Sequence, residues 1–352
     1  MICLDTEGID RFKTVLRHLV VGLVDSSMQV RLISSDTRID KLQLGPIKAI
    51  RHARLVWPFR TARLEALLSD LQSASPSIVH AISGDSYAKA FSIAEAFDAD
   101  LVLGLTCGHD IEQLALHDVG RVQRFVALSS PLAAALSEQY GVAEDRLEVI
   151  HPGVRTAGAC KSFTKGARTP AILCTTAFER GCGVDHLLRA VHRVIASGRN
   201  VMLFLLGSGP QEHRLRQLVR ELGLLAHVTF ANPLGDTSDV MDGSEIFVNP
   251  VPGSYIDVLR AMGMGMAVIT CADRFVDYYR HEETVLVSDP CETVGLTEAL
   301  FRLLDDAPFA RRLASGGMEY VKTSHSMSGM ADRLIETYRS LALARATFSI
   351  KE

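Results

Sequence analysis

Short apolar runs rich in β-branched residues alternate with amphipathic helical patterns along this chain. Such runs are typical of buried strands, and a helical pattern after each run is typical of βαβ units, whose strands are parallel. The alternation is interrupted by the polar, glycine-containing stretch 155–170, which has no apolar period and is the natural linker. We therefore predict an α/β protein with two successive doubly wound parallel sheets and a cleft between the two domains.

The length agrees with two domains, because 352 residues fit two cores of about 150 to 200 residues each. In the first half we expect strands over 1–4, 30–33, 55–59, 77–82, 101–105, 125–128 and 147–150, and helices over 10–24 and 61–71. In the second half we expect strands over 171–175, 201–206, 228–230, 246–248, 267–270 and 284–287. The helices expected there are 184–195, 212–222, 237–241, 256–262, 299–304, 310–321 and 327–344.

Composition narrows the class of protein. The formal net charge of −4 gives no general attraction to nucleic acid, so we expect no nucleic-acid partner. The 7 cysteines include no C-x-x-C pair, and several lie in apolar runs, which favours buried thiols in a reducing compartment over disulfides or a zinc site. Because the sequence shows neither a signal-peptide pattern nor a run of about 18 apolar residues, we expect a cytoplasmic protein.

The stretch 244–271, SEIFVNPVPGSYIDVLRAMGMGMAVITC, is the strongest candidate for a binding site. It combines a buried run, a Pro/Gly loop over 249–255, a short helix and a second buried run. Where a strand leads into a helix, unpaired N–H groups and the positive end of the helix dipole favour an anion. We therefore expect an anion site at the start of this helix. The segment GSGP at 207–210 is too short for a dinucleotide fingerprint, so we expect no NAD.

Two histidines, His80 and His109, lie at the ends of expected strands. At the carboxyl end of a parallel strand an imidazole faces the ligand crevice, where it can bind a sugar hydroxyl or accept a proton. The alternative for either one is a hydrogen-bonded loop histidine, because most of the 12 histidines of this chain must be structural.

Residues 41–63 are basic and carry the only tryptophan of the chain, Trp57. The cations in this segment run from Lys41 to Arg63, and it contains no Asp or Glu. Such a segment suits peripheral contact with an anionic membrane surface or a phosphate-bearing acceptor. The alternative is a solvated basic face beside a strand.

Several motifs of the second half stand in a recognisable order and spacing. They are VIHPGV at 149–154, GVDHLLRAV at 183–191, the stretch 203–230, EIFVNP at 245–250, GMGMAVIT at 263–270, the stretch 285–306 and ETYRSL at 336–341. Together they resemble the retaining GT-B glycosyltransferases of family 4, which carry a glycosyltransferases group 1 domain. In the first half the resemblance is architectural only, because Asp5-Thr6-Glu7-Gly8 replaces the usual Gly-Gly loop.

The resemblance implies transfer of a sugar from a nucleotide-sugar, UDP- or GDP-linked, to a carbohydrate or lipid-linked acceptor, with retention and without a required metal or other cofactor. It implies an acceptor-side domain over 1–154, a nucleotide-sugar-binding domain over 155–326 and a closing helix over 327–352 that crosses back towards the first domain. The protein would then be cytoplasmic, with peripheral contact at the inner face of the membrane through Lys41–Arg63.

The sequence departs from the family at three positions that carry charge there. Alignment of the motifs places Pro252 and Arg260 where the family has two Glu, and Cys182 where it has a Lys. Arg180, in the segment FERG, is the nearest replacement cation.

Two interpretations remain. In the first, the protein is a divergent transferase whose Arg180 and Arg260 neutralise the diphosphate, since a guanidinium fork suits that group. By resemblance the donor-binding residues are then Arg180, Gly183, Gly207, Gly209, Pro233, Gly253, Ser254, Tyr255, Asp257 and Arg260, with His109 or His80 contacting the sugar. Asp257 is either a carboxylate near the donor or a routine partner of the helix dipole. In the second, the protein is an inactive relative that serves as a binding or scaffold subunit in polysaccharide assembly.

Overall fold

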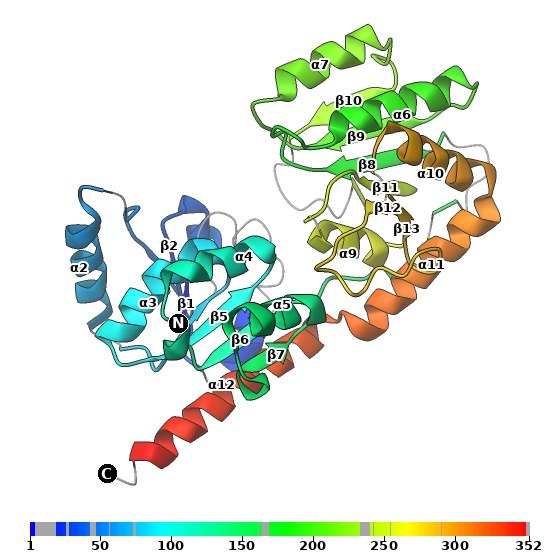
Figure 1. Cartoon of the computed structure of the whole chain (residues 1–352). Helices are drawn as coiled ribbons and strands as arrows, with labels where there is room; N and C mark the ends of the chain where they lie inside the picture. Colours follow the sequence, from blue (N-terminus) through cyan, green and yellow to red (C-terminus); the bar gives the residue numbers. More distant parts are fainter. Residues whose placement is uncertain are drawn as a thin grey trace. The chain divides into compact units, whose positions relative to one another are not determined.

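The computed structural model describes residues 1–3, 19–25, 28–42, 47–55, 57–72, 75–160, 162–163, 169–232, 240–241, 243–253, 255–289 and 291–349. The chain divides into two compact units. The first comprises Met1–Gly153 together with Met327–Glu352, and the second comprises Val154–Ser326 (Figure 1).

The first unit is built on a seven-stranded parallel sheet of order β3-β2-β1-β4-β5-β6-β7. Its strands are β1 (Ile2–Cys3), β2 (Arg31–Ser34), β3 (Lys48–Arg51), β4 (Ile78–Ala81), β5 (Asp100–Leu105), β6 (Arg124–Ala127) and β7 (Leu147–Val149). The inner strands are buried apolar runs, because helices cover both faces of a parallel sheet.

The helices of the first unit are α2 (Arg60–Leu71), α3 (Tyr87–Ala96), α4 (Gly108–Gln113), α5 (Ser130–Tyr140) and α12 (Met327–Ser349). Ser129 caps α5, where its hydroxyl accepts from the Leu132 amide at 3.4 Å, and Gly141 ends it with φ 63°. Helix α12 comes from the other end of the chain and buries Leu334 and Leu341.

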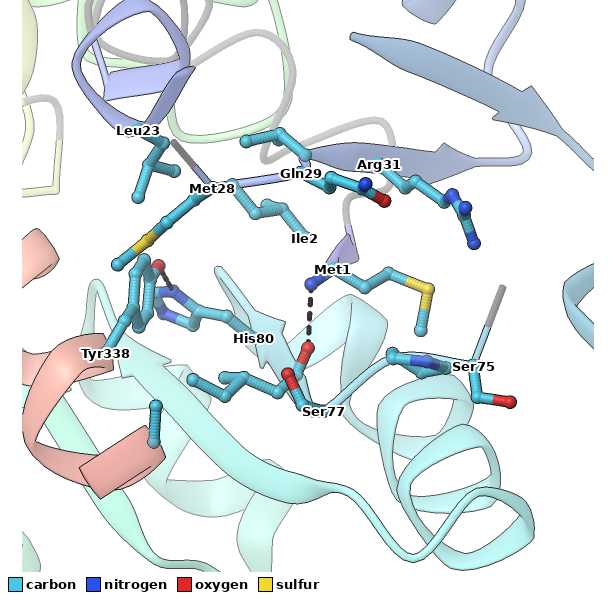
Figure 2. A pocket seen from close by; sticks show the side chains of 14 residues that line it. Met1, Ile2, Leu23, Met28, Gln29, Arg31, Ser75, Ser77, His80 and Tyr338 are labelled. Atoms are coloured by element: carbon cyan, nitrogen blue, oxygen red, sulfur yellow. Dashed lines mark hydrogen bonds between the residues drawn. The ribbon is translucent and has the colours of Figure 1, made fainter. Parts of the chain in front are cut away.

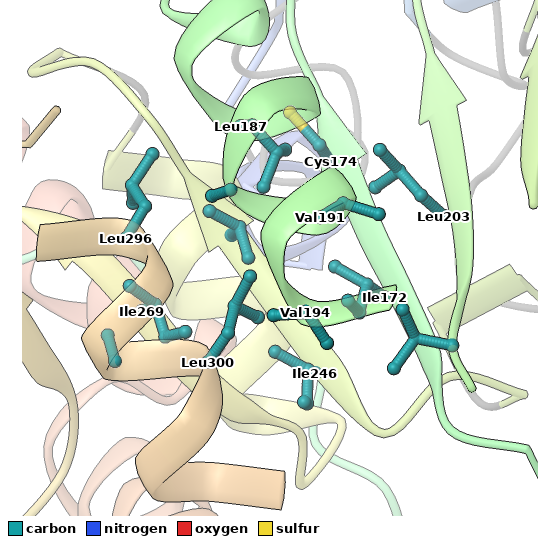
Figure 3. Packing of buried hydrophobic residues seen from close by; sticks show 14 of the residues in the cluster. Ile172, Cys174, Leu187, Val191, Val194, Leu203, Ile246, Ile269, Leu296 and Leu300 are labelled. Atoms are coloured by element: carbon teal, nitrogen blue, oxygen red, sulfur yellow. The ribbon is translucent and has the colours of Figure 1, made fainter. Parts of the chain in front are cut away.

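The second unit contains a six-stranded parallel sheet of order β10-β9-β8-β11-β12-β13. Its strands are β8 (Ala171–Thr175), β9 (Met202–Leu206), β10 (Val228–Ala231), β11 (Ile246–Asn249), β12 (Ala267–Cys271) and β13 (Leu286–Ser288). The helices are α6 (Val184–Ala196), α7 (Glu212–Glu221), α9 (Tyr255–Gly263), α10 (Thr293–Asp305) and α11 (Ala307–Ser324). Leu187 and Val191 of α6 pack with Leu300 of α10 over the sheet (Figure 3).

Both sheets have the doubly wound strand order. Each sheet therefore has one switch point, where the chain stops adding strands on one side of the sheet and continues on the other side. In the first unit this switch point lies between β1 and β4, and in the second between β8 and β11. Ligands of open α/β sheets bind at the carboxyl ends of the strands at such a point. The topology therefore selects one edge of each sheet as a candidate site.

Three local predictions either differ from the structure or fall largely outside its described residues. The strand expected over 55–59 is wrong: the described residues 57–59 form a turn, with a cis bond between Trp57 and Pro58, and the edge strand is β3. Pro58 has no N–H for a strand ladder, which explains why this apolar run does not pair. Most of the helix expected over 10–24 lies outside the described residues, which show helix over 19–25, and so does most of the helix expected over 237–241.

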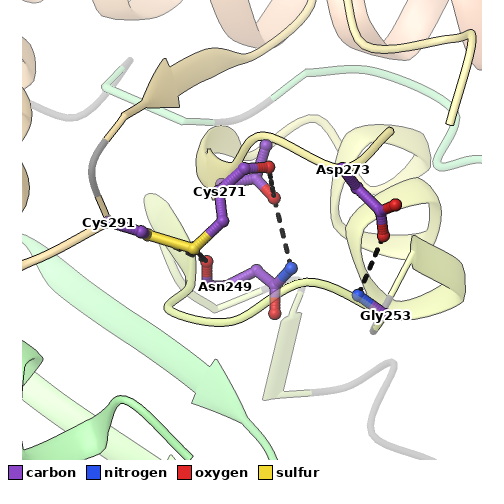
Figure 4. The surroundings of a disulfide bond; sticks show 6 residues. Asn249, Gly253, Cys271, Asp273 and Cys291 are labelled. Atoms are coloured by element: carbon purple, nitrogen blue, oxygen red, sulfur yellow. Dashed lines mark hydrogen bonds between the residues drawn. A yellow bond between two sulfur atoms is a disulfide. The ribbon is translucent and has the colours of Figure 1, made fainter. Parts of the chain in front are cut away.

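The expectation that all cysteines are free thiols is also wrong. Cys271, which ends β12, forms a disulfide with Cys291, just before α10, while five other cysteines remain free (Figure 4). The two lie 20 residues apart in sequence, but a parallel sheet brings the loops after neighbouring strands to the same edge.

Within the described ranges, no helix combines the length and apolar character needed to cross a bilayer. The same residues contain no group of three or more His, Cys, Asp or Glu side chains arranged to hold a metal ion.

Candidate functional site

The candidate site of the second unit lies at the carboxyl edge of its sheet, beside the switch point. Strand β8 ends at Thr175 and its neighbour β11 ends at Asn249. The loop 176–183 follows β8 and leads into α6, and the loop 250–254 follows β11 and leads into α9. The residues predicted to bind the donor lie mainly on these two loops and on the loop after β9.

The loop after β8 packs against the loop after β9 through their backbones. The Phe178 amide donates to the Ser208 carbonyl at 3.0 Å, and the Gln211 amide donates to the Phe178 carbonyl at 2.8 Å. A Cβ atom on Gly207 would lie 1.9 Å from the Thr176 carbonyl oxygen. A Cβ atom on Gly209 would lie 2.6 Å from the Phe178 carbonyl oxygen. Gly207 and Gly209 are therefore needed for close loop packing, and their contact with a nucleotide stays a prediction.

Gly183 connects the loop after β8 to the loop after β11. It has φ 69°, and a Cβ atom there would lie 2.5 Å from the Pro250 carbonyl oxygen. Its neighbour Cys182 is buried, and burial raises the pKa of this thiol, so it is uncharged at neutral pH. Position 182, where the GT-B family that the sequence resembles has a Lys, thus carries no charge in this chain.

Arg180 is exposed on the loop after β8. In the part of the chain that the structure describes, no acidic side chain forms an ion pair with it. Its guanidinium is available to an anion at this edge.

Arg260 and Asp257 lie one turn apart on α9. The Arg260 Nη1 group donates to Asp257 Oδ1 at 3.3 Å, and the two side chains are 23% and 32% exposed. Burial raises the pKa of Asp257, whereas Arg260 and the Thr175 hydroxyl lower it. The structure therefore brings together Asp257, Arg260 and the end of β8, at the switch point.

The amides at the start of α9 are only partly available. The Gly253 amide donates to Asp273 Oδ2 at 3.0 Å (Figure 4), so a phosphate oxygen there would replace that carboxylate. Tyr255 is buried, at 4% exposure, as the first residue of α9. Ser254 and Pro233 lie outside the described residues.

In the first unit His109 lies at the corresponding carboxyl edge, on the short helix α4 that follows β5. Its imidazole is exposed, with Nδ1 3.0 Å from Glu112 Oε2 and Nε2 3.0 Å from Gln113 Nε2. The helix is held by Asp110, a buried residue that the sequence analysis did not select. Asp110 accepts from the Thr106 amide at 2.6 Å and the Gly84 amide at 2.7 Å, which joins the loops after β5 and β4. An Asp at the third position of a helix after a strand is the signal that could have identified it.

His80 has a different environment. It lies within β4, is 2% exposed, and its Nδ1 is 2.5 Å from the Tyr338 hydroxyl of α12. Both residues line a cavity of about 340 Å³ with Ser77 and Met28, at the amino ends of the strands (Figure 2). Burial lowers the pKa of His80 to about 3, so the imidazole stays neutral at neutral pH. His80 therefore lies away from the carboxyl edge, at which ligands of such sheets bind.

Residues 169–306 match the family model described as Glycosyl transferases group 1. The chain is 29% identical over 224 residues to the lipopolysaccharide core biosynthesis glycosyltransferase LpsD of Rhizobium meliloti, an alignment that covers 62% of this chain and 64% of the relative. The chain thus spans less than two thirds of the length of that relative. It is also 25% identical over 279 residues, 70% of this chain and 71% of the relative, to a GDP-mannose-dependent alpha-(1-6)-phosphatidylinositol monomannoside mannosyltransferase of Mycobacterium tuberculosis.

Among solved structures, Anabaena HepE in complex with UDP and glucose superposes with a TM-score of 0.79 and 14% sequence identity, over 96% of this chain and 98% of that one. At this identity the likeness concerns the fold, which in both halves is a doubly wound parallel sheet. Residues 169–306 thus match the Glycosyl transferases group 1 model, in a chain that has the fold of the GT-B glycosyltransferases.

Proposed function

We propose that this protein transfers a sugar from a UDP- or GDP-linked donor to a carbohydrate or lipid-linked acceptor, with retention of anomeric configuration and without a metal. The group 1 domain supports the reaction class. The relatives named above act in lipopolysaccharide core biosynthesis and on a phosphatidylinositol mannoside, which supports such acceptors. HepE is solved with UDP and glucose, which supports the donor class.

The observation that carries the proposal is the placement of Arg180 and of the Asp257–Arg260 pair at the switch point between β8 and β11. When the sugar leaves its donor, negative charge develops on the departing diphosphate, and cations and N–H groups fixed at that position lower the barrier. In our proposal Arg180 and Arg260 neutralise this charge. Gly183, Gly207 and Gly209 hold the surrounding loops close enough to form the nucleotide wall.

On the acceptor side we propose that the domain 1–154 holds the acceptor, with His109 contacting the transferred sugar. In this proposal the donor domain is 155–326, and the closing helix 327–352 returns to the acceptor-side domain. We place the protein in the cytoplasm, in peripheral contact with the membrane through Lys41–Arg63.

A second candidate function is that of an inactive relative that binds a nucleotide-sugar or serves as a scaffold. Two observations favour it: the uncharged Cys182 thiol at the position of the family's Lys, and the engagement of Arg260 by Asp257. Loss of charged groups that act in a transition state typically costs about 2 to 4 kcal/mol each.

Isothermal titration with UDP and GDP tests the donor site. We expect one of the two to bind, and Arg180→Ala to weaken that binding at least about tenfold, because a charge-assisted contact is lost. Arg189→Ala is the matched control, since Arg189 is exposed on α6 away from the loop. A donor-hydrolysis assay then separates enzyme from binder, since a binder releases no free nucleotide. Absence of heat with both nucleotides would contradict the donor site.

A further inference from the structure

The cavity that His80 and Tyr338 line is separate from the site proposed above. It has a volume of about 340 Å³ and lies at the amino ends of β1, β2 and β4 (Figure 2). Small-molecule sites have volumes of about 300 to 1,000 Å³, so the cavity is large enough for such a ligand. The proposed donor and acceptor residues follow the carboxyl ends of their strands. A ligand of this cavity would therefore be distinct from both.

One face of the sheet forms an apolar wall of the cavity. Ile2 of β1 and His80 of β4 are partners in the parallel register. Ile78 lies two residues before His80, so these three side chains project from the same face of the sheet. Leu23 and Val30, which are both buried, add further apolar surface. The wall around the imidazole is therefore suited to an apolar molecule.

The other side of the cavity belongs to α12, which contributes Tyr338 and Ala342. Tyr338 is 5% exposed, whereas Ala342 and Ser77 are exposed, so a small molecule can enter from solvent. Arg31 also lines the cavity, but its side chain extends away from Tyr338 (Figure 2). The buried end of the cavity is thus apolar except for the His80–Tyr338 pair.

One nitrogen of His80 has no hydrogen bond. Nδ1 lies 2.5 Å from the Tyr338 hydroxyl, but Nε2 has no partner among the residues that the structure describes. An unpaired polar atom at a buried position costs free energy, because the atom has lost its water and gained nothing in return. Since His80 lines the cavity, a ligand atom bound there could pair with Nε2.

The Tyr338 hydroxyl decides what kind of ligand atom is required. Its partner within the described part of the chain is His80. If Tyr338 donates to Nδ1, the neutral imidazole carries its proton on Nε2, and that N–H is the one unpaired group of the two side chains. The reverse arrangement leaves both the Tyr338 O–H and the Nε2 lone pair without a partner, so it is less stable. Nε2 is therefore a donor that requires an acceptor.

The size and charge of the ligand follow from the same cavity. A cavity of about 150 Å³ holds benzene, so 340 Å³ corresponds to about 14 non-hydrogen atoms. Burial lowers the pKa of His80 to about 3, so the imidazole offers a hydrogen bond but no positive charge. An ionised group would lose its hydration beside Ile2 and Leu23 without gaining a counter-charge from His80.

We propose that this cavity binds a neutral, mainly apolar small molecule through one carbonyl oxygen, which accepts a hydrogen bond from His80 Nε2. The apolar body of the ligand packs on Ile2, Leu23 and Val30. The proposal does not rest on the proposed transferase, because binding at this edge requires neither UDP nor GDP.

Benzophenone is a suitable probe, because it has the expected size and a single ketone oxygen. Irradiation attaches the bound ketone covalently: its oxygen takes a hydrogen atom from a neighbouring C–H group, and the two carbons then form a bond. We expect saturable labelling of the full chain, with the label on Met28, whose side chain lines the cavity (Figure 2). Peptide mass spectrometry locates the label. Diphenylmethane, which lacks the oxygen, is the matched competitor.

Two variants test the cavity and the hydrogen bond separately. Ala342→Trp should fill the cavity and weaken labelling at least about tenfold. Ala344→Trp is its control, because Ala344 is exposed on the same helix but does not line the cavity. His80→Phe should lower the preference for benzophenone over diphenylmethane about fivefold, because one hydrogen bond is lost. Since Ala342 is exposed, its variant remains informative even if His80→Phe does not fold.

Three results would overturn the proposal: labelling that does not saturate, equal labelling of the parent chain and Ala342→Trp, or an unchanged ligand preference in folded His80→Phe. The last result would mean that water, and not the ketone, pairs with Nε2. Titration of Ala342→Trp with UDP and GDP keeps the two proposals distinguishable. Loss of labelling with unchanged nucleotide affinity supports a separate site, whereas labelling without nucleotide binding removes the proposed transferase alone.

Discussion

Arg260 donates from Nη1 to the carboxylate of Asp257 at 3.3 Å, across one turn at the start of α9. Both side chains are partly buried, and burial raises the pKa of Asp257 while Arg260 opposes that shift. An incoming diphosphate would therefore compete with Asp257 for the same guanidinium. Affinity for the donor should therefore depend on the Asp257 carboxylate as well as on Arg180 and Arg260.

Removal of each partner should therefore have opposite effects on nucleotide binding. We expect Arg260→Ala to weaken UDP or GDP affinity about tenfold, because a charge-assisted contact is lost. Asp257→Asn should keep or improve affinity, because the negative charge that competes with the phosphate for Arg260 is removed. Isothermal titration measures both. Equal losses in the two variants would instead mean that the pair acts as one structural unit.

The contact between Gly183 and Pro250 should be sensitive to a single methyl group. Gly183 and Gly181 both have left-handed backbones, at φ 69° and 78°, but a Cβ on Gly181 would meet no atom within 4 Å. Gly181→Ala should lower the free energy of unfolding by about 1 kcal/mol, which is the cost of a left-handed backbone at alanine. Gly183→Ala should cost about 2 kcal/mol more, because of the clash with the Pro250 carbonyl. Calorimetric unfolding checks the difference, and equal costs would show that the loops separate without penalty.

His80 should make the first unit sensitive to mild acid. Its pKa is about 3 in the folded chain, against an ordinary value of 6.5, so below pH 6.5 the unfolded state binds the additional proton and stability falls. Between pH 7.5 and 5.5 this linkage removes about 1.4 kcal/mol. Urea unfolding followed by circular dichroism should show this loss, and His80→Gln should reduce it.

The control for His80 is His109→Gln, because His109 is exposed. Comparison of the two variants separates the loss of the buried His80 imidazole from the loss of an exposed one. If His80→Gln retained the full acid sensitivity of the parent chain, the cause would lie in other groups.

The disulfide between Cys271 and Cys291 should stabilise the second unit. With a separation of 20 residues, closing the loop in the unfolded chain contributes about 3 kcal/mol. Dithiothreitol should therefore lower the unfolding temperature of the oxidised protein. Cys291→Ser should start at the lower temperature and show no response to reductant, and a response in that variant would point to another thiol.

The local pattern of the sequence was sufficient for most of the second sheet. Strands β8, β9, β11 and β12 are buried apolar runs that lie within a residue of the predicted ones. The same rule failed at 55–59, because an apolar run becomes a strand only where a neighbouring strand accepts its hydrogen bonds. The strand that pairs with β2 is instead Lys48–Arg51, which is less apolar.

The glycines of the candidate site could be selected from the sequence, but the atoms that require them could not. Gly207 meets Thr176, and Gly183 meets Pro250, through contacts between loops that follow different strands. The sequence also predicted that the Gly253 amide faces a phosphate, but it did not show that this amide already donates to Asp273.

What the sequence by itself determined is the alternation of strands and helices, and with it the doubly wound class and the family resemblance, because these depend on periodicity and local motifs. Only the tertiary structure decided which strand forms the edge, that Cys271 pairs with Cys291, and that His80 faces Tyr338. Each of these depends on residues distant in sequence that meet only when the parallel strands stack in register, and periodicity carries no information on that.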